Sequence, residues 1–132
     1  MEKITTAKLQ DSKSQHKKIC MLTAYDYPFA KILDEAGVDI VLIGDSLGNV
    51  ALGYENTLPV SMQEMLIHTR AVARAVEQAM IVADMPFGSF QKKSKEALGN
   101  AIDLVKAGAE AVKIEGVQYL DAVKRIIKAG IP

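Results

Sequence analysis

Four short apolar segments alternate with four helical segments along this chain, and this alternation constrains the fold more than any other feature. The segments expected to form strands are Ile19–Ala24, Asp39–Ile43, Met80–Asp84 and Ala111–Glu115. A helical spacing of apolar residues follows each of them, and nothing between them indicates an antiparallel hairpin. Strands that alternate with helices form a parallel sheet on which the helices pack. The sequence therefore predicts an α/β fold.

The helices have recognisable start signals. Asp26 is expected to cap the first long helix, and Ser61 with Glu64 forms a capping box for the second. Ser94 is expected to cap the third, and the last helix is expected at about 118–128. A short additional helix is possible at 5–13, before the first strand. These signals divide the chain into regular strand–helix units.

Two architectures fit repeated strand–helix units: an open doubly wound sheet and a (β/α)8 TIM barrel. A complete barrel takes about 250 residues, whereas this chain has 132. Its last two residues, Ile131 and Pro132, resemble the approach to a fifth strand. We expect one partial domain over residues 1–132, the N-terminal half of a (β/α)8 barrel with about the first four units.

Composition excludes several classes of function. Sixteen basic and sixteen acidic side chains give no net charge, so there is no basic surface for nucleic acid. No apolar run approaches the roughly 20 residues of a membrane span, and the N-terminus lacks the apolar core of a signal peptide. The single cysteine, Cys20, cannot form an internal disulfide and is expected to be a small buried apolar residue. We expect a cytoplasmic protein.

Acidic residues follow three of the predicted strands. Asp45 comes just after the second strand, Asp84 ends the third and Glu115 ends the fourth. The carboxyl ends of parallel strands converge on the ligand in α/β folds. Three carboxylates brought together there would repel one another, and a cation with oxygen ligands would relieve that repulsion. The pattern predicts a Mg²⁺ site formed by these three acids.

Two further residues suggest what kind of substrate would bind beside the cation. Lys113 lies two residues before Glu115 and points to the same side of its strand. Ser46 adds a hydroxyl next to Asp45, in a loop whose glycines expose backbone N–H groups. An ammonium, a hydroxyl and a metal together suit a small anionic oxo compound, such as a 2-oxo acid.

Simpler interpretations of these residues remain open from the sequence. Asp45 could merely turn the chain, and Lys113 could only neutralise Glu115. Tyr25, at the end of the first strand, could line the mouth of the site or simply pack. His68 is expected to have a structural role or to lie on the surface.

A resemblance to a known family covers the chain from about residue 19 to its end. It rests on the segments LTAYDYPF, GDSLGN, TLPV, VADMPFGSF and AVKIEG. These segments resemble the ketopantoate hydroxymethyltransferases, a family of (β/α)8 barrel enzymes of pantothenate biosynthesis. The resemblance implies transfer of a hydroxymethyl group from 5,10-methylenetetrahydrofolate to 3-methyl-2-oxobutanoate, which gives 2-dehydropantoate.

The resemblance also implies roles for individual residues. The family's Mg²⁺ ligands match Asp45, Asp84 and Glu115, and its oxo-acid contacts match Asp45, Ser46, Asp84 and Lys113. The family's general base is a glutamate in the second half of the barrel, so no catalytic base is expected within residues 1–132. The full-length protein is expected to be a homo-oligomer that binds a 2-oxo acid and a folate.

Two alternatives to this transferase are kept. The chain could belong to another Mg²⁺-dependent barrel enzyme that acts on oxo acids, of the phosphoenolpyruvate mutase and isocitrate lyase type. It could also be a non-catalytic half-barrel subunit that pairs with a second chain. As a truncated transferase, the chain is expected to be inactive by itself and to aggregate or self-associate.

Overall fold

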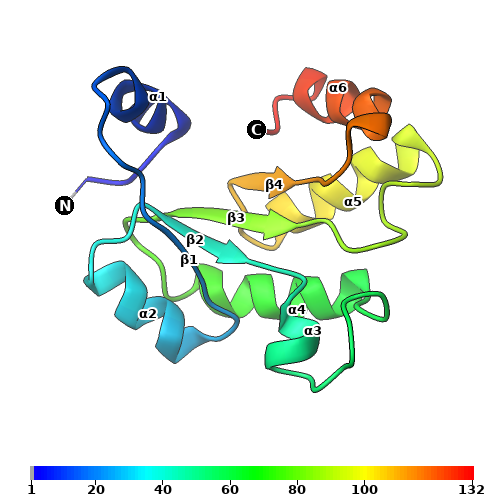
Figure 1. The fold of residues 1–132 in the computed structure, drawn as a ribbon, viewed down its shortest axis with the longest axis horizontal. Coiled ribbons are helices and arrows are strands. Elements are labelled where there is room, and N and C mark those ends of the chain that lie inside the picture. The colour runs from blue at the N-terminus through cyan, green and yellow to red at the C-terminus, as the bar shows by residue number, and fades with distance from the viewer. Residues whose placement is uncertain (1) are drawn as a thin grey trace.

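A parallel four-stranded sheet forms the centre of the structure, a computed structural model that describes residues 2–132 (Figure 1). The strands pair side by side in the order in which they follow along the chain. They are β1 (Met21–Thr23), β2 (Ile40–Ile43), β3 (Met80–Asp84) and β4 (Ala111–Lys113). Parallel neighbours joined by helical crossovers confirm the predicted α/β fold.

Helices connect the strands and follow one another around one side of the sheet (Figure 1). They are α1 (Thr6–Ser14), α2 (Tyr27–Glu35), α3 (Leu47–Val50), α4 (Met62–Ala73), α5 (Ser94–Lys106) and α6 (Leu120–Lys128), with a 3₁₀ turn, η1, at Val117–Tyr119. Each of α2, α4, α5 and α6 contacts the next along the chain. None of the helices from residue 2 onward is long and apolar enough to cross a membrane.

Most of the predicted helix starts agree with the structure. The Asp26 carboxylate accepts the Phe29 N–H at 2.9 Å, and both halves of the capping box of Ser61 and Glu64 are present. The prediction for α5 was wrong by one residue, because Lys93 occupies the N-cap position and makes no side-chain cap bond. The short helix α3 lies inside a stretch that was expected to be loop.

The core lies between the sheet and its helices. Val41 and Ile43 of β2 are fully buried, as are Met65 of α4 and Leu104 of α5. These side chains belong to central elements, where apolar surface is removed from water on all sides.

The first strand is exposed, although its run of apolar residues is typical of a buried strand. Met21 and Leu22 are 49% and 48% exposed. Successive side chains of a strand point to opposite faces, so β1 is uncovered on both faces, at the edge of the sheet. Cys20, just before β1, is exposed for the same reason and is not the buried residue that we expected.

The opposite edge of the sheet continues beyond β4. The Val112 N–H donates to the carbonyl oxygen of Pro132 at 3.1 Å. Backbone from the end of the chain therefore lies beside β4, on the side away from β3. This pairing agrees with the interpretation of the last residues as the approach to a fifth strand.

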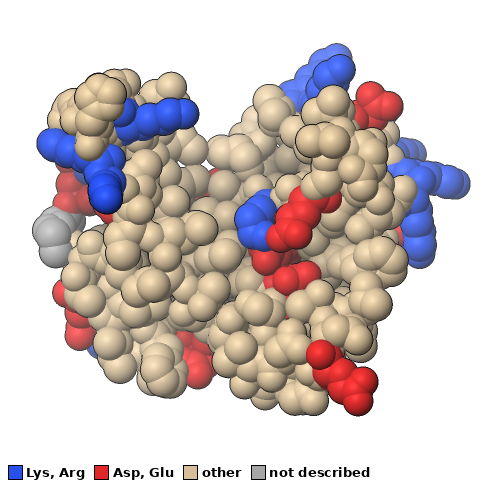
Figure 2. Space-filling model, in the orientation of Figure 1, with Lys and Arg blue, Asp and Glu red and all other residues tan. Residues whose placement is uncertain are grey.

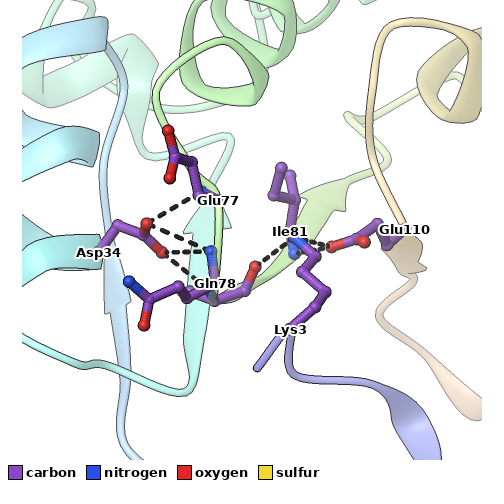
Figure 3. Close-up of polar contacts among 7 residues, drawn as sticks. Lys3, Asp34, Glu77, Gln78, Ile81 and Glu110 are labelled. Carbon is purple, nitrogen blue, oxygen red and sulfur yellow. Dashed lines mark hydrogen bonds and ion pairs between the residues drawn. The ribbon is translucent and has the colours of Figure 1, made fainter. Parts of the chain in front are cut away.

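A buried carboxylate fixes the loop that leads into β3 (Figure 3). Asp34 of α2 is only 4% exposed, and its oxygens accept the backbone N–H groups of Glu77, Gln78 and Ala79 at 2.7 to 3.2 Å. Burial raises the pKa of Asp34, but these three donors outweigh it and the pKa is lowered overall. Asp34 therefore joins α2 to the start of β3.

The N-terminal arm reinforces the same region from the other side of β3 (Figure 3). The Lys3 ammonium donates to the Ala79 carbonyl at 2.7 Å and pairs with Glu110 at 3.0 Å. Glu110 in turn accepts the Ile81 N–H at 2.8 Å. The amino end of β3 is thus held by side chains from α2, from the N-terminal arm and from the residue before β4.

Replacing Asp34 by alanine is expected to destabilise the fold by about 3 kcal/mol, because three backbone N–H groups, that of Ala79 in a buried bond and the other two in part-buried bonds, lose their acceptor. The midpoint of thermal unfolding of a complete barrel that contains residues 1–132, followed by circular dichroism at matched concentration, should fall by about 6 to 12 °C. Asp103→Asn, at an exposed position of α5, is the control and should change the midpoint little.

The contribution of Asp34 also depends on pH. Its folded-state pKa is lowered, so its stabilisation is complete above the unfolded value of about 3.9 and is lost as pH falls through the folded-state pKa. An Asp34→Ala midpoint equal to that of the parent chain at pH 7 would contradict this role.

Candidate functional site

Four of the predicted site residues line one pocket at the carboxyl edge of the sheet. Asp45 lies two residues beyond β2, while Asp84 and Lys113 end β3 and β4 and are partners in the strand register. Glu115 follows β4. All four border a pocket of about 180 Å³. Near the middle of the face in Figure 2, acidic and basic side chains lie against one another.

Asp84 is the most buried member of this group, with a side chain 8% exposed. Its Oδ2 accepts the backbone N–H of Asp45 at 3.0 Å, which ties the end of β3 to the loop after β2. Its Oδ1 lies 2.7 Å from the Lys113 ammonium. That contact is an ion pair without hydrogen-bond geometry, so Oδ1 is a buried oxygen with no hydrogen-bond partner.

Lys113 bridges two of the acids. Its Nζ lies 2.7 Å from Asp84 Oδ1 and donates to Glu115 Oε1 at 2.8 Å. Burial lowers the pKa of Lys113, but the two carboxylates outweigh burial and the pKa is raised overall. Lys113 in turn lowers the pKa of Glu115, whose side chain is 83% exposed. The neutralising pair of Lys113 and Glu115, left open by the sequence, is present.

Asp45 lies in the net negative field of the other two acids, which Lys113 compensates only in part. Burial raises its pKa, and the negative charges of Asp84 and Glu115 raise it further, while Lys113 acts in the opposite direction. A second positive charge near Asp45 would therefore be favourable. This electrostatic field is the physical basis for considering a cation here.

The carboxylates suit Mg²⁺ by their chemistry, because this ion takes oxygen ligands. The repulsion at Asp45 is a feature that a cation would relieve, whereas Oδ1 of Asp84 already faces the Lys113 ammonium at 2.7 Å. Within residues 2–132, however, no group of three or more His, Cys, Asp or Glu side chains is arranged to hold a metal ion. The donor set fits, and a Mg²⁺ site shared by Asp45, Asp84 and Glu115 stays a prediction.

Ser46 lies at the border of the pocket and does not line it. It occupies the N-cap position of α3, yet its side chain makes no cap bond. A Cβ placed on Gly44 would lie 2.7 Å from Ser46 Oγ and 3.5 Å from Asp84 Oδ2. A side chain at position 44 would therefore displace the Ser46 hydroxyl. This close approach explains why glycine follows the apolar strand β2.

Tyr25 and His68 connect this border to α4. The Tyr25 and Ser46 hydroxyls are hydrogen-bonded at 2.7 Å. The Tyr25 carbonyl is hydrogen-bonded to Nδ1 of His68, which must be the donor because a carbonyl only accepts. His68 therefore has the structural role that was expected, and Tyr25 reaches a residue of the site.

The other wall of the pocket is apolar and was not identified from the sequence. It is formed by Leu58, Met85, Phe87 and Phe90, with Thr57 and Gln91 beside them. Leu58 and Phe87 are 59% and 60% exposed, although side chains of this type usually pack in a core. They belong to loops without periodicity, so no sequence pattern distinguished them from ordinary loop residues.

A larger surface hollow lies elsewhere. Its volume is about 370 Å³, and it is lined by Ser94 of α5 and by four charged residues of α6, namely Asp121, Lys124, Arg125 and Lys128. It shares no residue with the pocket at the strand ends. The chemistry described above therefore concerns the smaller pocket.

Several solved structures have the same fold as this chain. Superposition with a phosphonopyruvate hydrolase gives a TM-score of 0.75 at 16% identity, over 98% of this chain and 48% of that one. The phosphoenolpyruvate phosphomutase of Streptomyces platensis subsp. rosaceus gives 0.73 at 17% identity, over 93% and 48%. A 2,3-dimethylmalate lyase, described as a phosphoenolpyruvate mutase/isocitrate lyase superfamily member, gives 0.69 at 14%, over 95% and 49%.

At these identities the likeness concerns the fold alone. The chain corresponds to about half of each barrel. The expected fold, about half of a (β/α)8 barrel, is thereby confirmed.

Curated relatives are much more similar in sequence. The chain is 56% identical to the 3-methyl-2-oxobutanoate hydroxymethyltransferase of Ignicoccus hospitalis, over 100% of this chain and 51% of the relative. The enzyme of the same name from Pyrococcus abyssi is 54% identical, over 100% and 47%. The chain spans about half the length of these relatives. The sequence model of the ketopantoate hydroxymethyltransferase family matches residues 3–132, and the chain belongs to this family.

Proposed function

We propose that residues 1–132 form the part of a 3-methyl-2-oxobutanoate hydroxymethyltransferase that binds the oxo acid and Mg²⁺. In this proposal the whole enzyme transfers a hydroxymethyl group from 5,10-methylenetetrahydrofolate to 3-methyl-2-oxobutanoate and yields 2-dehydropantoate. The observation that carries the proposal is the pocket at the strand ends, in which Lys113 contacts Asp84 and Glu115 beside Asp45. Relatives that are more than half identical over the chain support the choice of reaction.

The two walls of the pocket match the two ends of the proposed substrate. The Lys113 ammonium, already desolvated in part, pairs with the substrate carboxylate and exchanges one carboxylate partner for another. The apolar side chains of Leu58, Met85 and Phe87 pack against the isopropyl group. Binding at both ends fixes the position of the oxo group and of C3.

In this proposal the acids bind the metal and orient the groups around it. Asp45, Asp84 and Glu115 hold Mg²⁺, which when bound polarises the oxo group of the substrate and makes its C3 proton more acidic. Asp84 also orients the ligands around it, through its contacts with the Asp45 N–H and with Lys113. The glutamate that the family uses to remove the C3 proton is expected outside residues 1–132. The C3 enolate then forms the new C–C bond to the one-carbon unit of the folate. The C–N bonds of that carbon break, one water supplies its hydroxyl group, and tetrahydrofolate leaves.

The alternative enzyme class is less well supported. Structures of the phosphoenolpyruvate mutase and isocitrate lyase type share the fold at 14 to 17% identity, far below the 56% of the transferase from Ignicoccus hospitalis. The folate donor, the homo-oligomeric assembly and the cytoplasmic location stay predictions.

A chimera tests the proposal. Residues 1–132 are joined to the C-terminal half of the Ignicoccus hospitalis relative, which is 56% identical over the region replaced. With Mg²⁺ and 5,10-methylenetetrahydrofolate, the chimera is expected to form 2-dehydropantoate, measured by mass spectrometry, and to exchange the C3 proton of 3-methyl-2-oxobutanoate.

The intact relative is the positive control. A folded chimera that performs neither reaction would refute the proposal. Turnover of phosphonopyruvate or 2,3-dimethylmalate in place of the proposed substrate would favour the alternative enzyme class.

A further inference from the structure

We propose that Tyr25 is a positioning residue of the oxo-acid site and acts through Ser46. Its phenol donates a hydrogen bond to Ser46 Oγ, so that the Ser46 proton is directed away from Tyr25 and toward the bound oxo acid. The two hydroxyl oxygens lie 2.7 Å apart although 21 positions separate the residues. The inference rests on the proposed function and extends it to Ser46, whose hydroxyl lies at the border of the pocket, close to the Asp84 carboxylate.

The backbone at Tyr25 is held from two sides. Ala24 is buried, and its N–H donates to the Leu42 carbonyl at 3.1 Å, which extends the pairing of β1 with β2. The Tyr25 carbonyl accepts from His68 of α4. Although β1 is the exposed edge of the sheet, its carboxyl end is therefore fixed where the phenol leaves it.

Ser46 is constrained in a complementary way. Its hydroxyl makes no cap bond to α3, so the phenol of Tyr25 is the partner found for it within residues 2–132. Gly44 leaves the space that the hydroxyl occupies, because a Cβ there would lie 2.7 Å from Ser46 Oγ. That Cβ would also lie 3.5 Å from Asp84 Oδ2. The Ser46 hydroxyl and the Asp84 carboxylate therefore border the same small volume.

The chemistry of the two hydroxyl groups sets the direction of the bond. Each can donate one proton and accept two, and a phenol is the more acidic of the two types and hence the better donor. With Tyr25 as donor, the proton of Ser46 is free for another acceptor. A hydroxyl that accepts one hydrogen bond donates a stronger hydrogen bond than a hydroxyl that accepts none, because hydrogen bonds in series polarise one another. A substrate carboxylate or oxo oxygen is the acceptor that the proposed function provides.

A double-mutant cycle in the chimera tests this role. Tyr25→Phe is expected to raise KM for the oxo acid about tenfold, as the loss of one hydrogen bond allows, and to change kcat less than threefold. In a Ser46→Ala background, Tyr25→Phe should have no further effect, since the residue through which it acts is gone. Tyr27→Phe, exposed on α2, is the matched control.

Two outcomes would overturn the inference. If the effects of Tyr25→Phe and Ser46→Ala on KM multiply in the double variant, Tyr25 acts independently of Ser46. An unchanged KM in the folded Tyr25→Phe variant would mean that the phenol does not position the site.

A readout without substrate separates failure of this inference from failure of the proposed function. The ¹³Cζ resonance of Tyr25, assigned with Tyr25→Phe, is expected to shift on Ser46→Ala in the chimera. If the resonance shifts but the chimera does not act on 3-methyl-2-oxobutanoate, the proposed function fails and the Tyr25–Ser46 contact stands. If the resonance does not shift, the contact itself is refuted.

Discussion

Residues 1–132 by themselves are expected to show no measurable hydroxymethyl transfer, whereas the chimera is expected to be active. The family's general base is expected outside these residues, and loss of one positioned base commonly costs a factor of about 10² to 10⁴. The remaining wall of the barrel would be absent as well. The combined loss should exceed that of any single substitution in the pocket.

The structure also gives a reason for the isolated chain to associate. The edge strand β1 exposes Met21 and Leu22 on opposite faces, and unpaired backbone groups beside apolar side chains favour pairing with another chain. Apolar residues that line a second open surface, beside β4, include Val112, Ile126 and Ile127. Both surfaces are available to another copy of the chain.

Size-exclusion chromatography with light scattering, together with the turnover assay, checks this prediction. Soluble aggregates without turnover are the expected result. A defined dimer with cooperative melting would instead support the half-barrel subunit considered from the sequence. A monomer that turns over substrate with no other chain present would contradict the prediction outright.

The parts of the fold that local chemistry determines could be predicted from the sequence. The cap at Asp26 and the capping box of Ser61 and Glu64 depend on side chains within three residues of their backbone partners. The bounds of β3 were also correct, because an apolar run ends there at an acid. The position of Asp45 and Asp84 at neighbouring strand ends followed from parallel pairing alone.

Features that depend on distant neighbours could not be predicted. The exposure of β1 and of Cys20 is set by the position of that strand in the sheet, which the composition of the strand does not encode. Asp34 meets backbone groups 43 to 45 positions away, so no local motif marks it. The hydrogen bond of Tyr25 to Ser46 and the apolar wall at Leu58 and Phe87 likewise join separate loops.

In the chimera, Asp84→Asn is expected to reduce C3 proton exchange of 3-methyl-2-oxobutanoate by about 10² to 10³-fold. The substitution keeps the size of the side chain and an oxygen that can accept the Asp45 N–H. It removes the charge that Lys113 contacts at 2.7 Å, although Lys113 keeps Glu115 as a carboxylate partner. It also removes one of the three carboxylates proposed to hold Mg²⁺.

Two further variants distinguish loss of the contact with Lys113 from loss of a Mg²⁺ ligand as the cause of the reduced exchange. Lys113→Met removes the ammonium and retains Asp84, so it should raise KM for the oxo acid, while the Mg²⁺ concentration for half-maximal exchange should not rise because the site becomes more negative. Asp84→Asn should raise that Mg²⁺ concentration, and Asp103→Asn on the exposed face of α5 should change neither quantity. If exchange in the folded Asp84→Asn chimera equals that of the parent, Asp84 is not a metal ligand. The electrostatic argument for a cation at the strand ends would then fail with it, because Asp84 supplies the charge that acts most strongly on Asp45.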